Sequence, residues 1–355
     1  MNVPTKIDTW QMVEPGKLER TSIDVPELGS GDVLVKVAGC GVCHTDVGYF
    51  YDGVPTVQKP PLTLGHEVSG TVVAGVESLI GKEVIIPAVM PCNNCDICAS
   101  GRGNRCLKQK MPGNSMGIYG GFSNYIPVPS EDLCIVEDRK GIPLEHMAVI
   151  ADAMTSPYQA AMRAGIKEGD LVVITGATGG IGVHMTQIAA ALGAKEVIAI
   201  ARNKEKLERS LDFGATKALS TLDKDIKGIR NDFRTYCKEK GLPTYGWTIF
   251  ECSGSKAGQE IGLELLSFVG KMLVVGYGMQ KVEYMLSRLM AFDAEIIGTW
   301  GCLPKYYKDV LDMVLDGRIK LEPFVETRPM SQIEQSFKES HAGKLMKRIV
   351  LIPDF

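Results

Sequence analysis

The segment LVVITGATGGIG, at positions 171–182, constrains the fold more than any other part of this sequence. It opens with a continuous apolar run, which is typical of a parallel strand buried on both faces. The glycines that follow permit a tight turn, and the whole stretch from 171 to 194 carries no Asp, Glu, Lys or Arg. Because the glycines interrupt it, this stretch predicts a buried strand and helix rather than a membrane span.

The chain continues this order of strand and helix beyond the glycine turn. After the first helix we expect a second strand at 196–201, and then further alternation: helix 203–213, strand 248–252, helix 257–268 and strand 272–275. Strands that alternate with helices form a parallel sheet covered on both faces. The pattern therefore predicts a doubly wound α/β domain with a nucleotide site at the glycine turn.

The regions before and after that domain have a different pattern of apolar and polar residues. The first 150 residues look all-β and rich in loops, with β-branched or alternating runs at 32–37, 67–76 and 82–87. After about residue 300 we expect one helix at 306–315, then a loop and a closing strand at 348–352.

The length of the chain and its sequence patterns together suggest how it divides into domains. At roughly 150 residues per domain, a chain of 355 residues holds two or three domains. We predict a β-rich domain at 1–153, an inserted nucleotide-binding domain at 154–299, and a return of 300–355 to the first domain.

Composition excludes several classes of function. The chain has 39 Lys and Arg residues against 42 Asp and Glu residues, and its net charge of −3 argues against a nucleic-acid partner. Residues 1–18 contain charged side chains and no apolar core of signal-peptide length. We therefore expect a cytoplasmic protein with no nucleic-acid or membrane partner, whose ten cysteines stay reduced.

Four of these cysteines follow the spacing C-x2-C-x2-C-x7-C: Cys92, Cys95, Cys98 and Cys106. Four thiolates complete a tetrahedral shell around Zn²⁺, and a shell without an open position serves structure rather than catalysis. Free thiols, a disulfide pair and an iron–sulfur cluster are the alternatives. Clustered cysteines in a reducing compartment favour zinc.

Cys43 and His66 form a second candidate metal pair. Each follows a strand-like segment, and a thiolate and an imidazole both bind Zn²⁺. A catalytic zinc needs three protein ligands and an open position, and either Asp152 or Glu67 is a candidate for the third ligand. Asp46 is a candidate to accept the other ring N–H of His66. Taken alone, the pair also fits a core cysteine and a hydrogen-bonded histidine without a metal.

The glycine turn is the candidate cofactor site. Small residues let the backbone approach a pyrophosphate, and the N-terminus of the following helix supplies N–H donors. The residues concerned are Gly176, Ala177, Thr178, Gly179, Gly180, Ile181 and Gly182. A turn that is tightly packed for structural reasons alone is the alternative. The second strand ends at Ala201-Arg202, where an acidic residue usually binds the ribose of NAD, so Arg202 favours NADP.

Together these motifs resemble the zinc-dependent medium-chain alcohol dehydrogenase family. The resemblance covers essentially the whole chain, and its marks are GVCHTD at 41–46, GHE at 65–67, GGFSNY at 120–125, the four-cysteine segment, the glycine turn and Gly343-Lys344. It implies a β-rich GroES-like catalytic domain interrupted by a Rossmann domain. It also implies an oxidoreductase with two zinc ions per subunit, one catalytic and one structural.

The resemblance assigns the catalytic zinc to named residues. It implies that Cys43, His66 and Asp152 are the protein ligands. Glu67 resembles the neighbouring carboxylate that approaches the metal when water leaves.

It also assigns roles around the substrate and the cofactor. Thr45 resembles the hydroxyl that takes the substrate proton, and His44 resembles the residue near the cofactor pyrophosphate. Tyr277 and Trp300 fall where the family lines the nicotinamide pocket. Some members pass the proton to a histidine five residues after the cysteine ligand, but Gly48 stands at that position here. Water or the cofactor ribose is then the expected outlet.

Within the family, residues 40–67 and 106–125 resemble members that oxidise the ring alcohol of a cyclic acyl-CoA thioester to a ketone. Such members use NAD and are also associated with adding water to the preceding cyclic dienoyl-CoA. We follow this resemblance for NAD, with NADP as the alternative. The expected partners are a small-molecule acyl-CoA or alcohol and further copies of the chain, in a homotetramer or homodimer. The competing functions are a general secondary alcohol dehydrogenase that uses NADP and a zinc-free quinone or enoyl reductase.

Overall fold

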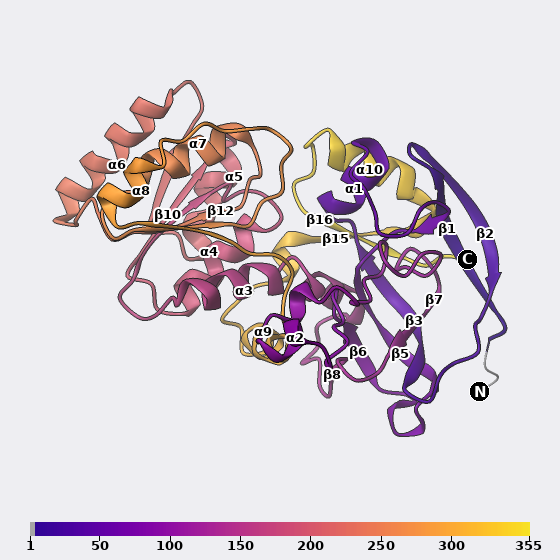
Figure 1. The fold of residues 1–355 in the computed structure, drawn as a ribbon. Helices are drawn as coiled ribbons and strands as arrows, with labels where there is room; N and C mark the ends of the chain where they lie inside the picture. Colours follow the sequence, from indigo (N-terminus) through magenta and orange to yellow (C-terminus); the bar gives the residue numbers. More distant parts are fainter. Residues whose placement is uncertain (1–3) are drawn as a thin grey trace. The chain divides into compact units, whose positions relative to one another are not determined.

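The computed structural model describes residues 4–355, which form two compact units. The first unit contains the chain up to Thr155 together with Gly301–Gly317 and Leu321–Phe355. The second contains Ser156–Trp300 and Arg318–Lys320. The second unit is therefore inserted into the first along the chain (Figure 1).

The second unit is built on a six-stranded sheet with the strand order β11-β10-β9-β12-β13-β14, in which all neighbouring strands are parallel. Its strands are β9 (Leu171–Thr175), β10 (Glu196–Ala201), β11 (Lys217–Ser220), β12 (Thr248–Glu251), β13 (Lys271–Val274) and β14 (Glu295–Gly298). Helices cover both faces of this sheet in Figure 1. They are α3 (Thr155–Ala164), α4 (Gly182–Ala191), α5 (Lys204–Arg209), α6 (Ile226–Lys240), α7 (Lys256–Leu265) and α8 (Ser287–Phe292).

Burial of both faces of the sheet explains why the sequences of β9 and β10 are continuous apolar runs. Val172, Val173 and Ile174 are all fully buried, because helices pack on both faces of the sheet. The chain runs from β9 outward to β10 and β11, and it then crosses to β12 on the other side of β9. Such a reversal opens a crevice at the carboxyl ends of the two central strands, where ligands bind in this type of sheet. The prediction of a doubly wound α/β domain is confirmed.

The first unit is mostly β-structure. A seven-stranded sheet joins β15, β16, β3, β5, β6 and β8 in that order, with β7 paired to β3, and a separate sheet joins β2, β1 and β4. The strands are β1 (Lys6–Glu14), β2 (Lys17–Asp24), β3 (Asp32–Gly41), β4 (Leu62–Thr63), β5 (Glu67–Gly75), β6 (Glu83–Ile86), β7 (Tyr125–Pro129), β8 (Cys134–Val136), β15 (Val325–Pro329) and β16 (Arg348–Ile352). Its core includes Val35, Val68 and Phe122.

The expectations for this unit need two corrections. The first 150 residues are not all-β, because α1 (His44–Tyr51) and α2 (Asp96–Ala99) interrupt the strands. The C-terminal segment holds more than helix α9 (Tyr307–Leu315) and β16, since it also forms β15 and α10 (Ile333–His341). Both additions have weak sequence signals: β15 ends in proline and two of its five residues are exposed, and α10 is mostly polar.

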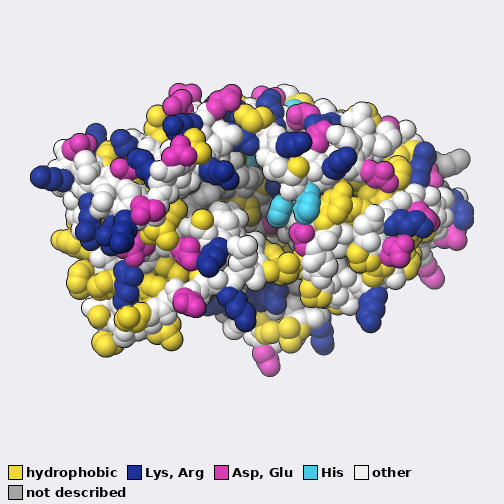
Figure 2. Space-filling model, turned by 90° about the horizontal axis from the view of Figure 1, so that it is seen from above, with side chains coloured by type: hydrophobic (Ala, Val, Ile, Leu, Met, Phe, Trp, Pro, Cys, Tyr) yellow, Lys and Arg dark blue, Asp and Glu magenta, His cyan; other side chains and the backbone are white. Residues whose placement is uncertain are grey.

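The surface agrees with the balanced composition. On the face drawn in Figure 2, basic and acidic side chains are interspersed among apolar ones. No helix among residues 4–355 is long and apolar enough to cross a bilayer.

Candidate active site

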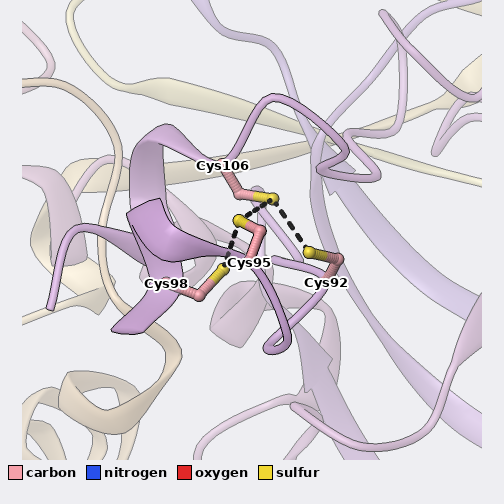
Figure 3. A group of neighbouring side chains, drawn as sticks. All are labelled: Cys92, Cys95, Cys98 and Cys106. Carbon is pink, nitrogen blue, oxygen red and sulfur yellow. Dashed lines mark hydrogen bonds between the residues drawn. The ribbon is translucent and has the colours of Figure 1, made fainter. Parts of the chain in front are cut away.

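The four clustered cysteines converge in the first unit, around α2 (Figure 3). Sγ of Cys106 lies 3.4 Å from that of Cys92 and 3.8 Å from that of Cys95, and Sγ of Cys95 lies 3.5 Å from that of Cys98. These separations are too long for disulfides, which bring the sulfurs to about 2 Å. Four sulfurs at about 2.3 Å from one tetrahedral zinc would lie about 3.8 Å apart. The donor set and its spacing therefore fit a structural zinc.

The loop around these cysteines is shaped by its backbone. Asn93 and Gly101 take left-handed conformations, with φ of 54° and 77°, which turn the chain around the sulfurs. Cys95 is the N-cap residue of α2. Hydrogen bonds from Cys98 lower the pKa of the Cys95 thiol to about 7, whereas loss of solvation raises the pKa of the Cys98 thiol to about 11. A zinc ion would favour the thiolate form of all four side chains, because metal binding releases their protons.

Cys43, His66 and Asp152 meet at a second point of the first unit. Cys43 caps α1, His66 directly precedes β5, and Asp152 follows the 3₁₀ helix at Leu144–Ala151. Oδ2 of Asp152 lies 3.6 Å from the Cys43 Sγ and 3.5 Å from the His66 Nε2. Zinc bound to a thiolate, an imidazole and a carboxylate holds these pairs of atoms about 3.6 and 3.4 Å apart. The three residues therefore fit one zinc ion with an open fourth position.

Asp46 orients the His66 ring and the backbone around the metal donors. Its carboxylate accepts hydrogen bonds from the Cys43 and Gly65 backbone N–H groups at 3.2 and 2.9 Å, and it lies 3.1 Å from the His66 Nδ1. With the ring proton on Nδ1, the lone pair of Nε2 points toward Cys43 and Asp152. Burial opposes a charge on His66, but the negative charges of Asp46 and Cys43 outweigh it and raise the His66 pKa well above its usual value. The pocket thus carries an excess of negative charge that suits a cation.

Glu67 has a partner that the sequence analysis missed. Both of its carboxylate oxygens are bound by the Arg348 guanidinium, and the Arg348 Nε lies 2.8 Å from the Glu67 Oε2. Burial raises the Glu67 pKa, while the charge and hydrogen bonds of Arg348 act against that rise. Arg348 already pairs with Glu67, whereas Asp152 lies beside Cys43 and His66. The geometry therefore favours Asp152 as the third ligand. Glu67 remains close by, within the same 4.8 Å donor group.

The glycine turn lies at the carboxyl end of β9. Gly176 has a φ of +73°, and a Cβ there would lie only 2.6 Å from the Ser253 side chain. A Cβ on Gly182, at the start of α4, would lie 2.1 Å from the Gly176 carbonyl oxygen. Gly176 therefore supplies the tight turn, although Ala177 stands at the first glycine of the strict pattern. Gly179 and Gly180 are exposed, as a backbone that receives a pyrophosphate must be.

A buried acid supports this turn from β12, and sequence reasoning did not find it. Glu251 is fully buried and accepts hydrogen bonds from the Ser253 N–H at 2.8 Å, the Gly254 N–H at 3.1 Å and the Thr175 hydroxyl at 3.4 Å. Burial raises its pKa and these donors oppose the rise. Glu251 thus ties the loop after β12 to the end of β9 at the switch point of the sheet.

The remaining predicted residues fall at the ends of these elements. Thr45 is half-buried and His44 is exposed, both on the first turn of α1. Arg202 is exposed directly after β10. The Tyr277 backbone packs against Gly254, while its side chain and that of Trp300 are 66% and 38% exposed. Arg202, Tyr277 and Trp300 therefore belong to the second unit, whereas the metal donors belong to the first.

The close approach at Gly182 leads to a testable prediction. Gly182→Ala should raise the Kd for the nicotinamide cofactor at least tenfold, because the new methyl group forces the helix start away from the turn. Gly298→Ala is the matched control, since a Cβ there meets no atom within 4 Å. Fluorescence titration with the reduced cofactor measures both variants, and unchanged affinity in Gly182→Ala would contradict this account of the turn.

Comparisons with known proteins agree with this arrangement. The family "Alcohol dehydrogenase GroES-like domain" matches residues 29–138, and the family "Zinc-binding dehydrogenase" matches residues 180–316. An alcohol dehydrogenase of Geobacillus stearothermophilus is 29% identical over 342 residues, which cover 95% of this chain and 96% of the relative.

Two solved structures extend the likeness to the whole fold. Galactitol-1-phosphate dehydrogenase from Escherichia coli has a TM-score of 0.86 at 25% identity and covers 98% of this chain and 100% of its own. Acetophenone reductase from Geotrichum candidum NBRC 4597, in complex with NAD, has a TM-score of 0.85 at 25% identity with both chains fully covered. With its GroES-like unit, its inserted Rossmann-type unit and its two metal-donor groups, the chain belongs to the zinc-dependent medium-chain alcohol dehydrogenase family.

Proposed function

We propose that this protein oxidises a secondary ring alcohol to a ketone and transfers the hydride to NAD. The observation that carries the proposal is the meeting of Cys43, His66 and Asp152 at distances that suit one zinc ion with three protein ligands. Three ligands leave a fourth position for the substrate oxygen.

The residues of the chain divide the work as follows. Zinc held by the three ligands would act as a Lewis acid that lowers the pKa of the substrate hydroxyl. Asp46 keeps the His66 proton on Nδ1, which leaves Nε2 to the metal. Thr45, in the first turn of α1 and two residues after Cys43, accepts the hydroxyl proton and passes it to water or the cofactor ribose, because Gly48 offers no imidazole. Bound NAD would accept the hydrogen on the alcohol carbon as hydride, so the alcohol and NAD⁺ would give a ketone, NADH and a proton.

The substrate that we propose is 6-hydroxycyclohex-1-ene-1-carbonyl-CoA, with the 6-oxo thioester as the product. Support comes from the two segments that carry the resemblance, 40–67 and 106–125, because they form the two walls of one groove of about 370 Å³ in the first unit. The lining residues are Gln58, Lys59 and Pro61 on one wall and Ser115, Met116, Gly117 and Ile118 on the other. Its single charged residue, Lys59, suits an anionic ligand such as a CoA phosphate.

Asn114 links the segments that line this groove to helix α1. Its Oδ1 accepts a hydrogen bond from the Val57 N–H at 2.7 Å, and its Nδ2 donates to the Tyr49 hydroxyl at 2.6 Å. Burial raises the Tyr49 pKa, and the nearby His66 acts against that rise. These hydrogen bonds join the two segments beside the groove to α1, whose N-cap residue is the metal donor Cys43, and this supports a substrate whose long arm lies in the groove.

A panel of alcohols tests the proposal. The zinc-loaded enzyme is mixed with NAD and with the cyclic hydroxyacyl-CoA ester, its free acid and simple secondary alcohols, and the absorbance of reduced nicotinamide is followed. We expect the highest kcat/KM for the CoA ester. Equal kcat/KM for the ester and the free acid would exclude the CoA substrate and favour the general secondary alcohol dehydrogenase. Incubation with the cyclic dienoyl-CoA without NAD tests the accompanying addition of water.

The choice of cofactor gives a separate prediction. Arg202→Ala should change the KM for NAD by less than about twofold, because NAD has no 2′-phosphate for the guanidinium to bind. An enzyme built for NADP would instead lose about tenfold or more in kcat/KM, since a hydrogen bond to a charged group contributes roughly 1.5–3 kcal/mol. Steady-state kinetics with both cofactors distinguish the two, and a large loss confined to NADP would overturn the choice of NAD.

The rival function is less well supported. A zinc-free quinone or enoyl reductase would need neither the four-cysteine group nor the Cys43 group, yet the spacing of both suits zinc. Metal analysis of the purified protein separates the two functions. Assembly into a homodimer or homotetramer stays a prediction that sedimentation can test.

A further inference from the structure

A cavity of about 110 Å³ lies in the second unit between helices α6, α7 and α8. Two of its lining residues, Thr244 and Ser267, belong to the connections that lead into β12 and β13. It therefore lies at the amino ends of these parallel strands, whereas the glycine turn follows the carboxyl end of β9. The cavity is distinct from the cofactor site.

The charge of the cavity is strongly positive. Three guanidinium groups line it, from Arg230, Arg234 and Arg288, and Glu264 is the single carboxylate among its lining residues. Glu264 pairs with Arg230 and, at 3.4 Å, with Arg288. Arg234 is exposed and forms no ion pair or hydrogen bond within residues 4–355. Two positive charges therefore remain after the pairing with Glu264.

Two buried donors near this charge lack partners. The Arg230 Nε and the hydroxyl of Tyr284, which is not itself a lining residue, have no hydrogen-bond partner among the described residues. Because both atoms are enclosed by the protein, the partly exposed guanidinium groups of Arg230 and Arg288 are the donors that an anion in the cavity would meet. The Arg288 guanidinium is held in place over two aromatic rings, 5.5 Å from the centre of Tyr284 and 5.4 Å from that of Phe292.

We propose that this cavity binds a phosphate-sized oxyanion, either inorganic phosphate or the phosphoryl group of a phosphomonoester. A tetrahedral oxyanion offers several acceptors to the forked donors of arginine. The volume equals that of about three to four waters at roughly 30 Å³ each, which is room for one such group. Basic side chains also gather at the left end of Figure 2, the end where Figure 1 places α6 and α8. A bound anion would tie Arg230 and Arg234 on α6 to Arg288 on α8, and so stabilise the second unit.

The test measures thermal stability of the zinc-loaded enzyme saturated with NADH, so that the glycine turn is already occupied. Inorganic phosphate at about fivefold excess over its Kd should raise the Tm by about 2–4 °C relative to sodium chloride of equal ionic strength. Arg234→Gln and Arg288→Gln should remove this shift. Arg209→Gln is the matched control, because the Arg209 guanidinium also lies over an aromatic ring, 5.4 Å from the centre of Phe213, but outside the cavity.

The sizes of the Tm shifts identify the ligand and show whether the proposal holds. A larger shift with glycerol 3-phosphate than with inorganic phosphate assigns a phosphomonoester, and the reverse order assigns the free anion. The proposal is wrong if the wild-type enzyme shows no shift, or if Arg234→Gln and Arg288→Gln keep the shift in full. Isothermal titration with phosphate provides a second reading on the same variants and does not depend on their melting behaviour.

Discussion

Exchanging Cys43 for serine should lower kcat by about a thousandfold or more and reduce the zinc content from two ions per subunit to one. Serine removes the thiolate from a group whose other two members, His66 and Asp152, are too few to hold a catalytic zinc. The lost Lewis acid contributes several kcal/mol to the transition state, and each 1.36 kcal/mol is a factor of about ten in rate. Metal analysis and steady-state kinetics on the same preparation provide the measurement.

A second buried thiol provides the control for this experiment. Cys134 lies in β8, outside both donor groups, so Cys134→Ser should keep both zinc ions and the wild-type kcat. A Cys43→Ser enzyme with one zinc and full activity would refute the assignment of the catalytic metal.

Exchanging Cys106 for serine should destabilise the protein rather than disable its chemistry. Cys106 is the buried member of the four-cysteine group, and its sulfur lies within 3.8 Å of those of Cys92 and Cys95. Metal binding of this kind contributes directly to folding free energy. A loss of several kcal/mol corresponds to a fall in Tm of about 10 °C, at roughly 2–4 °C per kcal/mol.

The metal count shows which site has been lost. Cys106→Ser should retain one zinc, and the fraction that stays folded at low temperature should turn over at a rate close to that of the wild-type enzyme. Unchanged Tm together with two zinc ions would show that the cluster is not a structural zinc site. A full loss of activity at low temperature, in protein that is still folded, would place the cluster in the chemistry instead.

Local pattern predicted four of the six strands and three of the six helices of the second unit, but it missed β11, β14, α3, α6 and α8. The expected strand at 196–201 coincides with β10, because the five residues after Glu196 are all apolar. The helix expected at 257–268 ends earlier, at Leu265, because the backbone of Leu266 is extended. Signals of this kind come from the period of buried side chains and need no knowledge of distant contacts.

Local pattern failed where an element depends on its neighbours. Helix α10 buries Ile333 and Phe337 against the first unit but is otherwise polar, so its amphipathic signal is short. Strand β15 is completed by pairing with β16 rather than by a strong run of its own.

The sequence by itself determined the fold class and the chemistry that is available to this chain. The four-cysteine spacing, the Cys43–His66 motifs and the glycine turn are short-range patterns, and each specifies its donors or its turn within a few residues. Only the tertiary structure decided which carboxylate faces those donors. Asp152 lies 109 residues from Cys43 along the chain, and Arg348 lies 281 residues from the Glu67 that it occupies. The same holds for the arginine cavity, since α6, α7 and α8 meet only after the sheet has assembled. Close pairs between distant residues depend on how strands and helices pack, and that packing leaves little trace in the residues on either side of each one.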